Sequence, residues 1–336
     1  MKLKQKNIIV SIFIVFIIIM AGIFISHRTS QNTRKQRHIA LGVWTEGLFD
    51  AKTQKLHPEK LQQFEQLIHK KVSIAHYYIG WEALANPGLI TQFNTLHSYG
   101  WEPMLNVNPY YFSQCPATEL PLYKAIAQGT CDTFLYKAGK NLHQVQQPFY
   151  LLFAWEMNNK DNSWSIPYTG STPDDFIAAW RHIHTIFKQE GVKNIVWVFC
   201  PNVPDDTLVP YNKIYPGNNY VDWIGLDGYN WGTTQSWSQW VSFAGVFTSS
   251  YNRLTALAPN KPLMIAEVNT TDQGGDKGAW YTDMLTKQIP YNFSKISAVV
   301  IFNEDRSKQE HVNWRVDVTP DALRAFRSAV NTSFYN

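Results

Sequence analysis

The sequence predicts an α/β fold: a single-domain (β/α)8 TIM barrel preceded by an N-terminal transmembrane helix. The chain has 336 residues, of which 45% are hydrophobic and 15% aromatic, so it can bury a large core and is not mainly disordered. From residue 38 onward, short apolar runs alternate with helical patterns, and no long linker or low-complexity tract interrupts them. The leader before residue 38 is basic and contains one long apolar run.

The leader has three predicted parts: a short basic N-terminus (1–7), a transmembrane anchor or signal segment (8–25) and a basic linker (26–37). As a helix, residues 8–25 would span about 27 Å, close to the hydrocarbon thickness of a bilayer. We expect this anchor to stay uncleaved, because Ile23–His27 offers no small-residue cleavage site. We therefore expect a membrane-anchored domain exported to the periplasm or the cell exterior, or a secreted domain if the leader is cleaved.

The formal net charge of +4 at pH 7 comes from the leader. Residues 1–37 hold seven of the 30 Lys and Arg residues and no acidic residue. The rest of the chain therefore has 23 basic against 26 acidic residues, a net charge of −3. A basic surface confined to the leader argues against a nucleic-acid-binding face on the domain, so we expect no nucleic acid partner.

Eight apolar runs predict the strands of the barrel. They are short, continuous and rich in Val, Ile, Leu and aromatic residues, as expected of parallel strands covered by helices. The predicted strands are residues 39–44, 72–78, 101–108, 149–155, 194–200, 221–227, 262–267 and 296–302. Eight strands alternating with helices favour a barrel over a doubly wound open sheet, and the first turn lacks a glycine-rich nucleotide fingerprint.

Helical patterns fill most of the gaps between these strands. The predicted helices are residues 58–70, 87–98, 133–146, 173–190, 237–258, 275–288 and 320–330. The clearest has Thr172 as its N-cap, Pro173 at its first position and Asp175 three residues after the cap. Its apolar stripe consists of Phe176, Trp180, Ile183 and Phe187. Residues 203–219 are rich in Pro and Gly and predict an irregular crossover instead of a full helix.

The three cysteines exclude a disulfide scaffold, and no CxxC pair is present for a thiolate zinc site or a redox motif. Cys115 and Cys131 flank a loop, whereas Cys200 lies in an apolar run. One bridge plus one buried thiol would suit an oxidising compartment, but three reduced thiols fit the sequence equally well.

Two glutamates stand at the carboxyl ends of predicted strands, where barrels place functional residues. Glu156 follows the strand 149–155, and Glu267 closes the strand 262–267. Two carboxyl groups facing one cleft suit acetal hydrolysis, in which one protonates the leaving oxygen and the other attacks the anomeric carbon or activates water. The alternative for either residue is a cap on the barrel rim or an ion pair with arginine.

The strand ends and the loops after them are rich in tryptophan and amide side chains. Indole rings stack on the C–H faces of sugars while Asn and Asp bind hydroxyl groups, so this composition favours a polysaccharide or oligosaccharide. The candidate substrate-binding residues are Trp81, Asn108, Trp155, Asn158, Trp164, Tyr229, Trp231 and Trp314. Further polar or aromatic residues at strand ends are Trp44, Asn202, Asp227, Asn230 and Asn303. We expect Trp180, Trp197 and Trp223 to lie in the core.

Five segments occur in one characteristic order: AWEMN (154–158), AWRHIHTIFKQEGVKNIVWVFCPN (179–202), YPGNNYVDWIGLDGYNWG (215–232), KPLMIAE (261–267) and NWRVD (313–317). Together they resemble glycoside hydrolase family 26, the β-mannanases and related β-glucanases of clan A. The resemblance implies a (β/α)8 barrel and a retaining double-displacement mechanism, with Glu156 as the acid/base and Glu267 as the nucleophile. It also implies that Tyr229 lies beside the nucleophile and that Trp314 matches a tryptophan after the eighth strand.

The sequence departs from the family pattern near Glu156. Trp155 stands where family members usually carry histidine, no arginine precedes it near the end of the fourth strand, and Phe302 occupies a position where tryptophan is common. Three consequences of Trp155 are open: an altered donor-sugar subsite, a changed acidity of Glu156, or a domain that binds glycans without cleaving them.

We therefore expect an O-glycosyl hydrolase similar to mannan endo-1,4-β-mannosidases, which attacks a β-1,4-linked mannan, glucomannan or related β-glucan internally. The alternative is a non-hydrolytic glycan-binding or exopolysaccharide-assembly protein on a glycosidase scaffold. We expect no cofactor and no metal, since His182 and His184 are two apart on a helix and face different sides. We further expect a monomer whose partners are its glycan substrate and, through the leader, a membrane.

Overall fold

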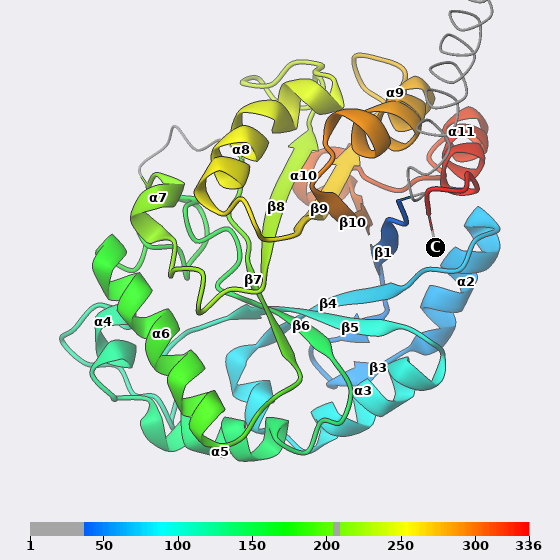
Figure 1. Ribbon diagram of the computed structural model, residues 1–336. Coiled ribbons are helices and arrows are strands. Elements are labelled where there is room, and N and C mark those ends of the chain that lie inside the picture. Colours follow the sequence, from blue (N-terminus) through cyan, green and yellow to red (C-terminus); the bar gives the residue numbers. More distant parts are fainter. Residues whose placement is uncertain (1–36, 204–208, 336) are drawn as a thin grey trace, which may run out of the picture. The chain divides into compact units, whose positions relative to one another are not determined.

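The computed structural model describes residues 37–203 and 209–335. Within these ranges, eight parallel strands close into a barrel whose neighbours around the ring follow the chain order (Figure 1). The strands are β1 (Ala40–Thr45), β4 (Ile74–Gly80), β5 (Glu102–Asn108), β6 (Phe149–Phe153), β7 (Ile195–Phe199), β8 (Trp223–Asn230), β9 (Leu263–Thr270) and β10 (Ile296–Asn303). All eight predicted strands are present, which confirms the (β/α)8 barrel.

The barrel closes where β1 pairs with β10 on one side and β4 on the other. Six residues of β1 are in register with β10, from Ala40 opposite Ala298 to Thr45 opposite Asn303. Gly42 makes the close approach to β4 possible, because a Cβ atom there would lie 2.8 Å from the Cβ of Ile74. The barrel interior is packed with Ile74, Met104, Leu152, Val198, Met264, Ala298 and Val300.

Two strands continue further than their apolar runs predict. β8 and β9 stay paired from Asp227 opposite Glu267 to Asn230 opposite Thr270. Their polar side chains in this stretch are largely buried, so the ladder extends through residues that resemble a loop in the sequence. In contrast, β6 ends at Phe153, which places Glu156 three residues beyond it.

Helices form the outer layer around the barrel (Figure 1). The seven predicted helices correspond to α2 (Pro58–Ile68), α3 (Gly88–Ser98), α5 (Asp132–Leu142), α6 (Pro173–Gln189), α8 (Phe243–Leu257), α9 (Lys277–Asp283) and α11 (Pro320–Val330). The predicted start of α8 at residue 237 is wrong, because Ser242 caps the helix and residues 237–242 form a loop. α9 continues as the π-helix η2 (Met284–Asn292).

Shorter elements complete the described part of the chain. The helical ones are η1 (Trp81–Ala85), α4 (Leu122–Ala127), α7 (Tyr211–Ile214) and α10 (Ser307–Glu310). Two small antiparallel pairs join β2 (Phe49–Asp50) to β3 (Lys55–Leu56) and β11 (Asp305–Arg306) to β12 (Val312–Asn313). In the irregular crossover predicted between β7 and β8, the described residues contain the four-residue α7.

The start of α6 shows how local sequence fixes an element. The Thr172 hydroxyl accepts a hydrogen bond from the Asp175 N–H (3.1 Å), and the Asp175 carboxylate accepts one from the Thr172 N–H (2.9 Å). This reciprocal capping box satisfies two N–H groups that the helix itself leaves unpaired. The predicted stripe of Phe176, Trp180 and Ile183 is buried, as is Phe187.

Cys115 and Cys131 form a disulfide, while Cys200 is a buried free thiol. Of the two alternatives that the sequence leaves open, the structure contains the bridge. It closes the loop between β5 and α5, which includes α4.

No helix in residues 37–203 and 209–335 is long and apolar enough to cross a bilayer. The predicted anchor 8–25 and its flanks 1–7 and 26–37 lie outside the described residues, except for residue 37 at the end of the second flank.

Replacing Thr172 with alanine removes the capping box and should lower the free energy of unfolding by about 1 kcal/mol. Thermal denaturation should show a melting temperature about 2 to 4 °C lower. The matched control is Thr185→Ala, because this exposed threonine of the same helix donates only to the Arg181 carbonyl within the helix. An equal loss of stability in both variants would contradict the role given to the cap.

Candidate active site

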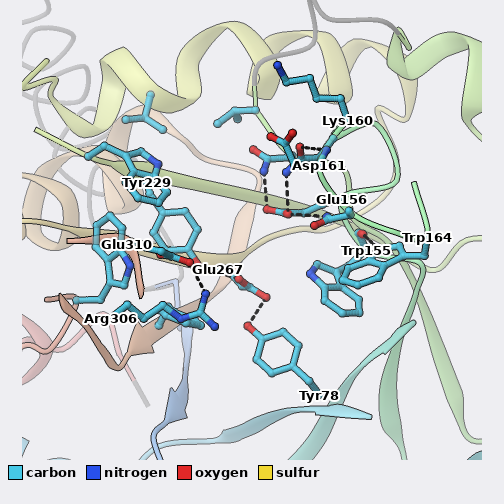
Figure 2. A pocket seen from close by; sticks show the side chains of 18 of the residues that line it. Tyr78, Trp155, Glu156, Lys160, Asp161, Trp164, Tyr229, Glu267, Arg306 and Glu310 are labelled. Atoms are coloured by element: carbon cyan, nitrogen blue, oxygen red, sulfur yellow. Dashed lines mark hydrogen bonds and ion pairs between the residues drawn. The ribbon is translucent and has the colours of Figure 1, made fainter. Parts of the chain in front are cut away.

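A cavity of about 1200 Å3 opens at the carboxyl ends of the barrel strands. Its wall contains residues that close or follow seven of the eight strands, among them Tyr78, Asn108, Asn202 and Phe302. Glu156 and Glu267 both line it, and Figure 2 shows their carboxyl groups facing the same space. The fold therefore brings together two acidic side chains that are 111 positions apart in the chain.

Glu267 lies within β9 and is held by donors from three other strands. Its Oε1 accepts hydrogen bonds from the Tyr78 hydroxyl (2.6 Å) and the Asn106 amide (2.7 Å), and its Oε2 accepts one from the Tyr229 hydroxyl (2.6 Å). The side chain is only 6% exposed. Donors on both oxygens favour the ionised carboxylate and fix its orientation in the cavity.

The backbone around Glu156 adopts an unusual conformation. Both Ala154 and Glu156 have φ of 51°, in the left-handed region that costs non-glycine residues free energy. The neighbouring strands hold this segment in place: the Ala154 N–H donates to the Val107 carbonyl (2.8 Å) and the Glu156 N–H to the Cys200 carbonyl (2.7 Å). The strain is confined to the point where the chain leaves β6 and presents Glu156 to the cavity.

Amide side chains surround the Glu156 carboxyl group. Its Oε1 accepts from the Asn202 amide (2.5 Å), and its Oε2 accepts from Asn162 (3.1 Å) and Asn159 (3.3 Å). Asn158 fixes Asn202 in turn, since its side chain accepts from the Asn202 N–H and donates to the Asn202 carbonyl, both at 2.9 Å. The buried Asn158 therefore positions a neighbour of Glu156, which corrects its predicted place in the substrate-binding wall.

Burial dominates the electrostatics of the two glutamates. Burial and the charge of Glu156 raise the pKa of Glu267 to about 8, and burial also raises the pKa of Glu156. The charge of Arg306, which lines the cavity, lowers the pKa of Glu267. Because the Glu156 charge opposes ionisation of Glu267, the protonation of one carboxyl group affects the pKa of the other.

Asp227 adds a third buried carboxyl group next to the pair. It lies opposite Glu267 in the β8–β9 ladder, and its Oδ1 accepts from the Cys200 thiol (3.3 Å). Burial and the charges of both glutamates raise the pKa of Asp227 well above the usual range. Below the site, His76 lies 3.9 Å from Glu267 Oε1, and burial lowers its pKa to about 3, which keeps the imidazole neutral.

Aromatic rings form two sides of the cavity. Trp155 and Trp164 are in contact (ring centroids 4.1 Å apart), and the Trp164 indole N–H donates to the Trp155 carbonyl (2.7 Å). Tyr229 lies on the other side of the carboxyl groups (Figure 2). Trp314 packs on Tyr229 and on Trp231, with ring centroids 4.9 Å apart in both pairs.

The structure also corrects the place predicted for Trp81. Its side chain is 1% exposed and packs against Phe112, Phe134 and Phe153, while its indole N–H donates to the Tyr110 carbonyl (2.9 Å). Trp81 therefore belongs to the core behind the site. The other candidates line the cavity: Asn108, Trp155, Trp164, Tyr229, Trp231 and Trp314.

Several residues of the site are not among the sequence candidates: Tyr78, Asn106, Asn159, Asn162, Arg306 and Glu310. The amides at 158, 159 and 162 follow Glu156 so closely that their density is a usable signal. Tyr78 and Asn106 carry no such signal, because only the pairing of β4 and β5 shows which side chains face the barrel interior. Arg306 bonds Glu310 (2.5 Å) and Glu304 (3.3 Å) from the loop after β10.

An eight-stranded barrel whose strand ends bring two buried carboxyl groups into an aromatic cleft has the arrangement expected of a glycoside hydrolase. The family model of glycosyl hydrolase family 26 matches residues 130–298, half of the chain. The chain belongs to this family.

Named relatives agree with this assignment. Endoglucanase H of Acetivibrio thermocellus is 32% identical over 289 residues, which are 82% of this chain and 29% of that protein. Mannan endo-1,4-beta-mannosidase A and B of Caldalkalibacillus mannanilyticus is 35% identical over 94 residues, 28% of this chain and 15% of that protein. The chain thus spans less than a third of the length of these relatives.

The fold is shared with the catalytic domain of the GH26 endo-beta-1,4-mannanase from Bacillus sp. JAMB-750. The TM-score is 0.66 at 19% identity, and the match covers 89% of this chain and 87% of that domain.

The raised pKa of Glu267 predicts a pH-dependent gain in stability for Glu267→Gln. Between about pH 4.5 and pH 8 the unfolded chain releases this proton while the folded chain keeps it, so rising pH destabilises the wild type in this window. Glutamine does not titrate, so Glu267→Gln does not lose stability in this pH window. Its melting temperature should match that of the wild type near pH 4 and exceed it by about 4 °C or more at pH 8.

Differential scanning calorimetry at several pH values measures this difference. The matched control is Glu119→Gln, which changes an exposed glutamate outside the cavity. A constant difference between Glu267→Gln and the wild type from pH 4 to pH 8 would show that Glu267 has an ordinary pKa.

Proposed function

We propose that this protein is a retaining β-glycosidase that cleaves β-1,4-linked glucan, mannan or glucomannan within the chain. The observation that carries the proposal is the pair of buried glutamates in one aromatic cavity, each oriented by its own set of donors. Membership of glycosyl hydrolase family 26 and the names of the relatives, an endoglucanase and mannan endo-1,4-beta-mannosidases, support it. The intact carboxyl pair argues against the non-hydrolytic alternative.

In the first step, the protonated Glu156 gives its proton to the glycosidic oxygen while Glu267 attacks the anomeric carbon. The bond between that carbon and the leaving oxygen breaks, and an ester between Glu267 and the sugar forms. In the second step, Glu156 takes a proton from water, the water oxygen attacks the same carbon, and the Glu267 carboxylate leaves. Two displacements restore the β-configuration.

The surroundings of each glutamate match its proposed role. Burial raises the pKa of Glu156, which favours the protonated form that the first step needs. The hydrogen bonds from Tyr78 and Tyr229 lower the pKa of Glu267 against the effect of burial, which favours the ionised form that attacks the sugar. When Glu267 becomes a neutral ester its negative charge disappears, so the pKa of Glu156 falls and the same side chain serves as the base.

The cavity supports a polymeric substrate of neutral sugars. Its aromatic walls offer stacking surfaces on both sides of the carboxyl groups, and its volume of about 1200 Å3 exceeds what a single sugar needs. Trp155 replaces the histidine usual in the family with an apolar ring that packs between Trp164 and Tyr78. We propose that this ring changes how the donor sugar is recognised, and that Glu156 can still transfer the proton.

Assays of Glu267→Gln and Glu156→Gln on mannan, glucomannan and mixed-linkage β-glucan test the proposal. The wild type should release new reducing ends from at least one of them, and Glu267→Gln should lose activity by about 10,000-fold or more. Glu156→Gln should lose about 100- to 10,000-fold on polysaccharide, since it cannot protonate the leaving oxygen. With a dinitrophenyl β-glycoside it should lose far less, and azide should accelerate it and yield a β-glycosyl azide.

Glu119→Gln is the control for changing a glutamate outside the cavity and should behave as the wild type. Binding of all three polysaccharides by the wild type without any cleavage would favour the non-hydrolytic alternative. An unchanged rate in Glu267→Gln would remove this residue from the mechanism.

We also propose that residues 1–37 attach the domain to a membrane and that the domain works outside the cytoplasm. The bridge between Cys115 and Cys131 supports this, because disulfides persist in oxidising compartments.

A further inference from the structure

Trp237 is an unusual member of the cavity wall. Its side chain is 71% exposed, the highest value among the large hydrophobic residues exposed in the described ranges. An indole held open to water beside a cavity gains free energy when an apolar surface covers it. The steps of glycosidic cleavage derived for Glu156 and Glu267 do not use this residue.

An aromatic row connects Trp237 with the reacting centre. We define the aromatic row as Tyr229, Trp314, Trp231 and Trp237. The Trp237 ring contacts Trp231 (centroids 5.6 Å apart), Trp231 contacts Trp314 (4.9 Å), and Trp314 contacts Tyr229 (4.9 Å). All four rings line the cavity, and the row ends at the Tyr229 hydroxyl, which donates to Glu267.

The loop 231–242 holds Trp237 in place before any ligand arrives. The Asn230 carboxamide oxygen accepts from the N–H groups of Gly232 (3.2 Å) and Val241 (3.0 Å), which closes the loop at both ends. Within the loop, the Ser238 hydroxyl donates to the Gly232 carbonyl (2.7 Å). The Gln235 side-chain amide links the loop to α10 by donating a hydrogen bond to the Glu310 carbonyl (2.6 Å).

Gly232 makes this loop conformation possible. Its φ is +52°, and a Cβ atom there would lie 2.0 Å from the carbonyl oxygen of Gln273. A ring presented by such an anchored loop loses little conformational entropy on binding, which is the condition for a preformed binding surface.

We propose that Trp237 forms a distal sugar-binding subsite, where its indole stacks on a pyranose ring of the substrate that a trisaccharide bound across the scissile bond does not reach. The ligand class is a neutral β-linked glycan, whose sugar rings present C–H faces that suit an indole. The subsite lies at the end of the aromatic row that starts at Tyr229. Figure 2 shows Tyr229 on the side of the carboxyl groups opposite Trp155 and Trp164. This inference rests on the proposed glycosidase function and adds a determinant of chain length to it.

Kinetics with oligosaccharides of increasing length test the subsite. In Trp237→Ala, kcat/KM for a β-1,4-linked hexasaccharide should fall about 3- to 10-fold, mainly through KM, because one stacking contact is lost. For the trisaccharide, which is too short to occupy both the catalytic centre and the distal subsite, the change should stay within about twofold. Trp237→Phe keeps an aromatic face and should recover most of the hexasaccharide loss.

The matched control is Tyr291→Ala, which removes another exposed aromatic ring, 61% exposed and outside the cavity. It should leave the rates on all lengths unchanged. The same fold loss for tri- and hexasaccharide in Trp237→Ala, or no loss with either, would overturn the subsite while leaving the glycosidase function intact.

Calorimetric measurement of hexasaccharide binding distinguishes the Trp237 subsite from the glycosidase function. In a Glu267→Gln background, adding Trp237→Ala should raise the Kd about 3- to 10-fold, whether or not the wild type cleaves the sugar. Binding with this dependence but without cleavage by the wild type would refute the function and keep the subsite. An unchanged Kd would refute the subsite.

Discussion

Burial of two carboxyl groups in one cavity is the constraint on which the rest of the site depends. Transfer of an ionised carboxylate out of water is costly unless hydrogen bonds replace its hydration. Here the donors come from side chains: two phenols and an amide at Glu267, and three amides at Glu156. Because neutral groups supply these bonds, they do not cancel the effect of the Glu156 charge, which raises the pKa of Glu267.

The barrel provides these donors because its strands end at one rim. Tyr78, Asn106 and Tyr229 reach Glu267 from β4, β5 and β8, so a shift in the register of any of these strands would remove a donor. Glu156 reaches the same space only through left-handed backbone at its own position and at Ala154. The packed barrel interior and the outer helices thus hold this strained segment in place.

The sequence predicts the strands well and the site in part, for different physical reasons. Apolar runs identify a buried strand, but the same rule ends β8 and β9 too early, because Asn230 and Asn269 are buried polar residues within a ladder. The capping box of α6 is local chemistry and can be found from residue types alone. Trp81 and Trp155 both follow an apolar run, yet one lies in the core and the other in the cavity, a difference that only the three-dimensional packing decides.

The central claim is that Glu267 is the group that becomes bonded to the sugar while Glu156 transfers protons. The most direct measurement is to incubate the protein with a 2-deoxy-2-fluoro-β-glycosyl fluoride of a cello- or manno-oligosaccharide, digest it and locate the added mass by mass spectrometry. The account predicts stoichiometric labelling of the peptide that contains Glu267, and release of the label when the inactivated protein is incubated with an acceptor sugar. A label on Glu156, or formation of the α-product as the first sugar released from a natural substrate, would contradict it.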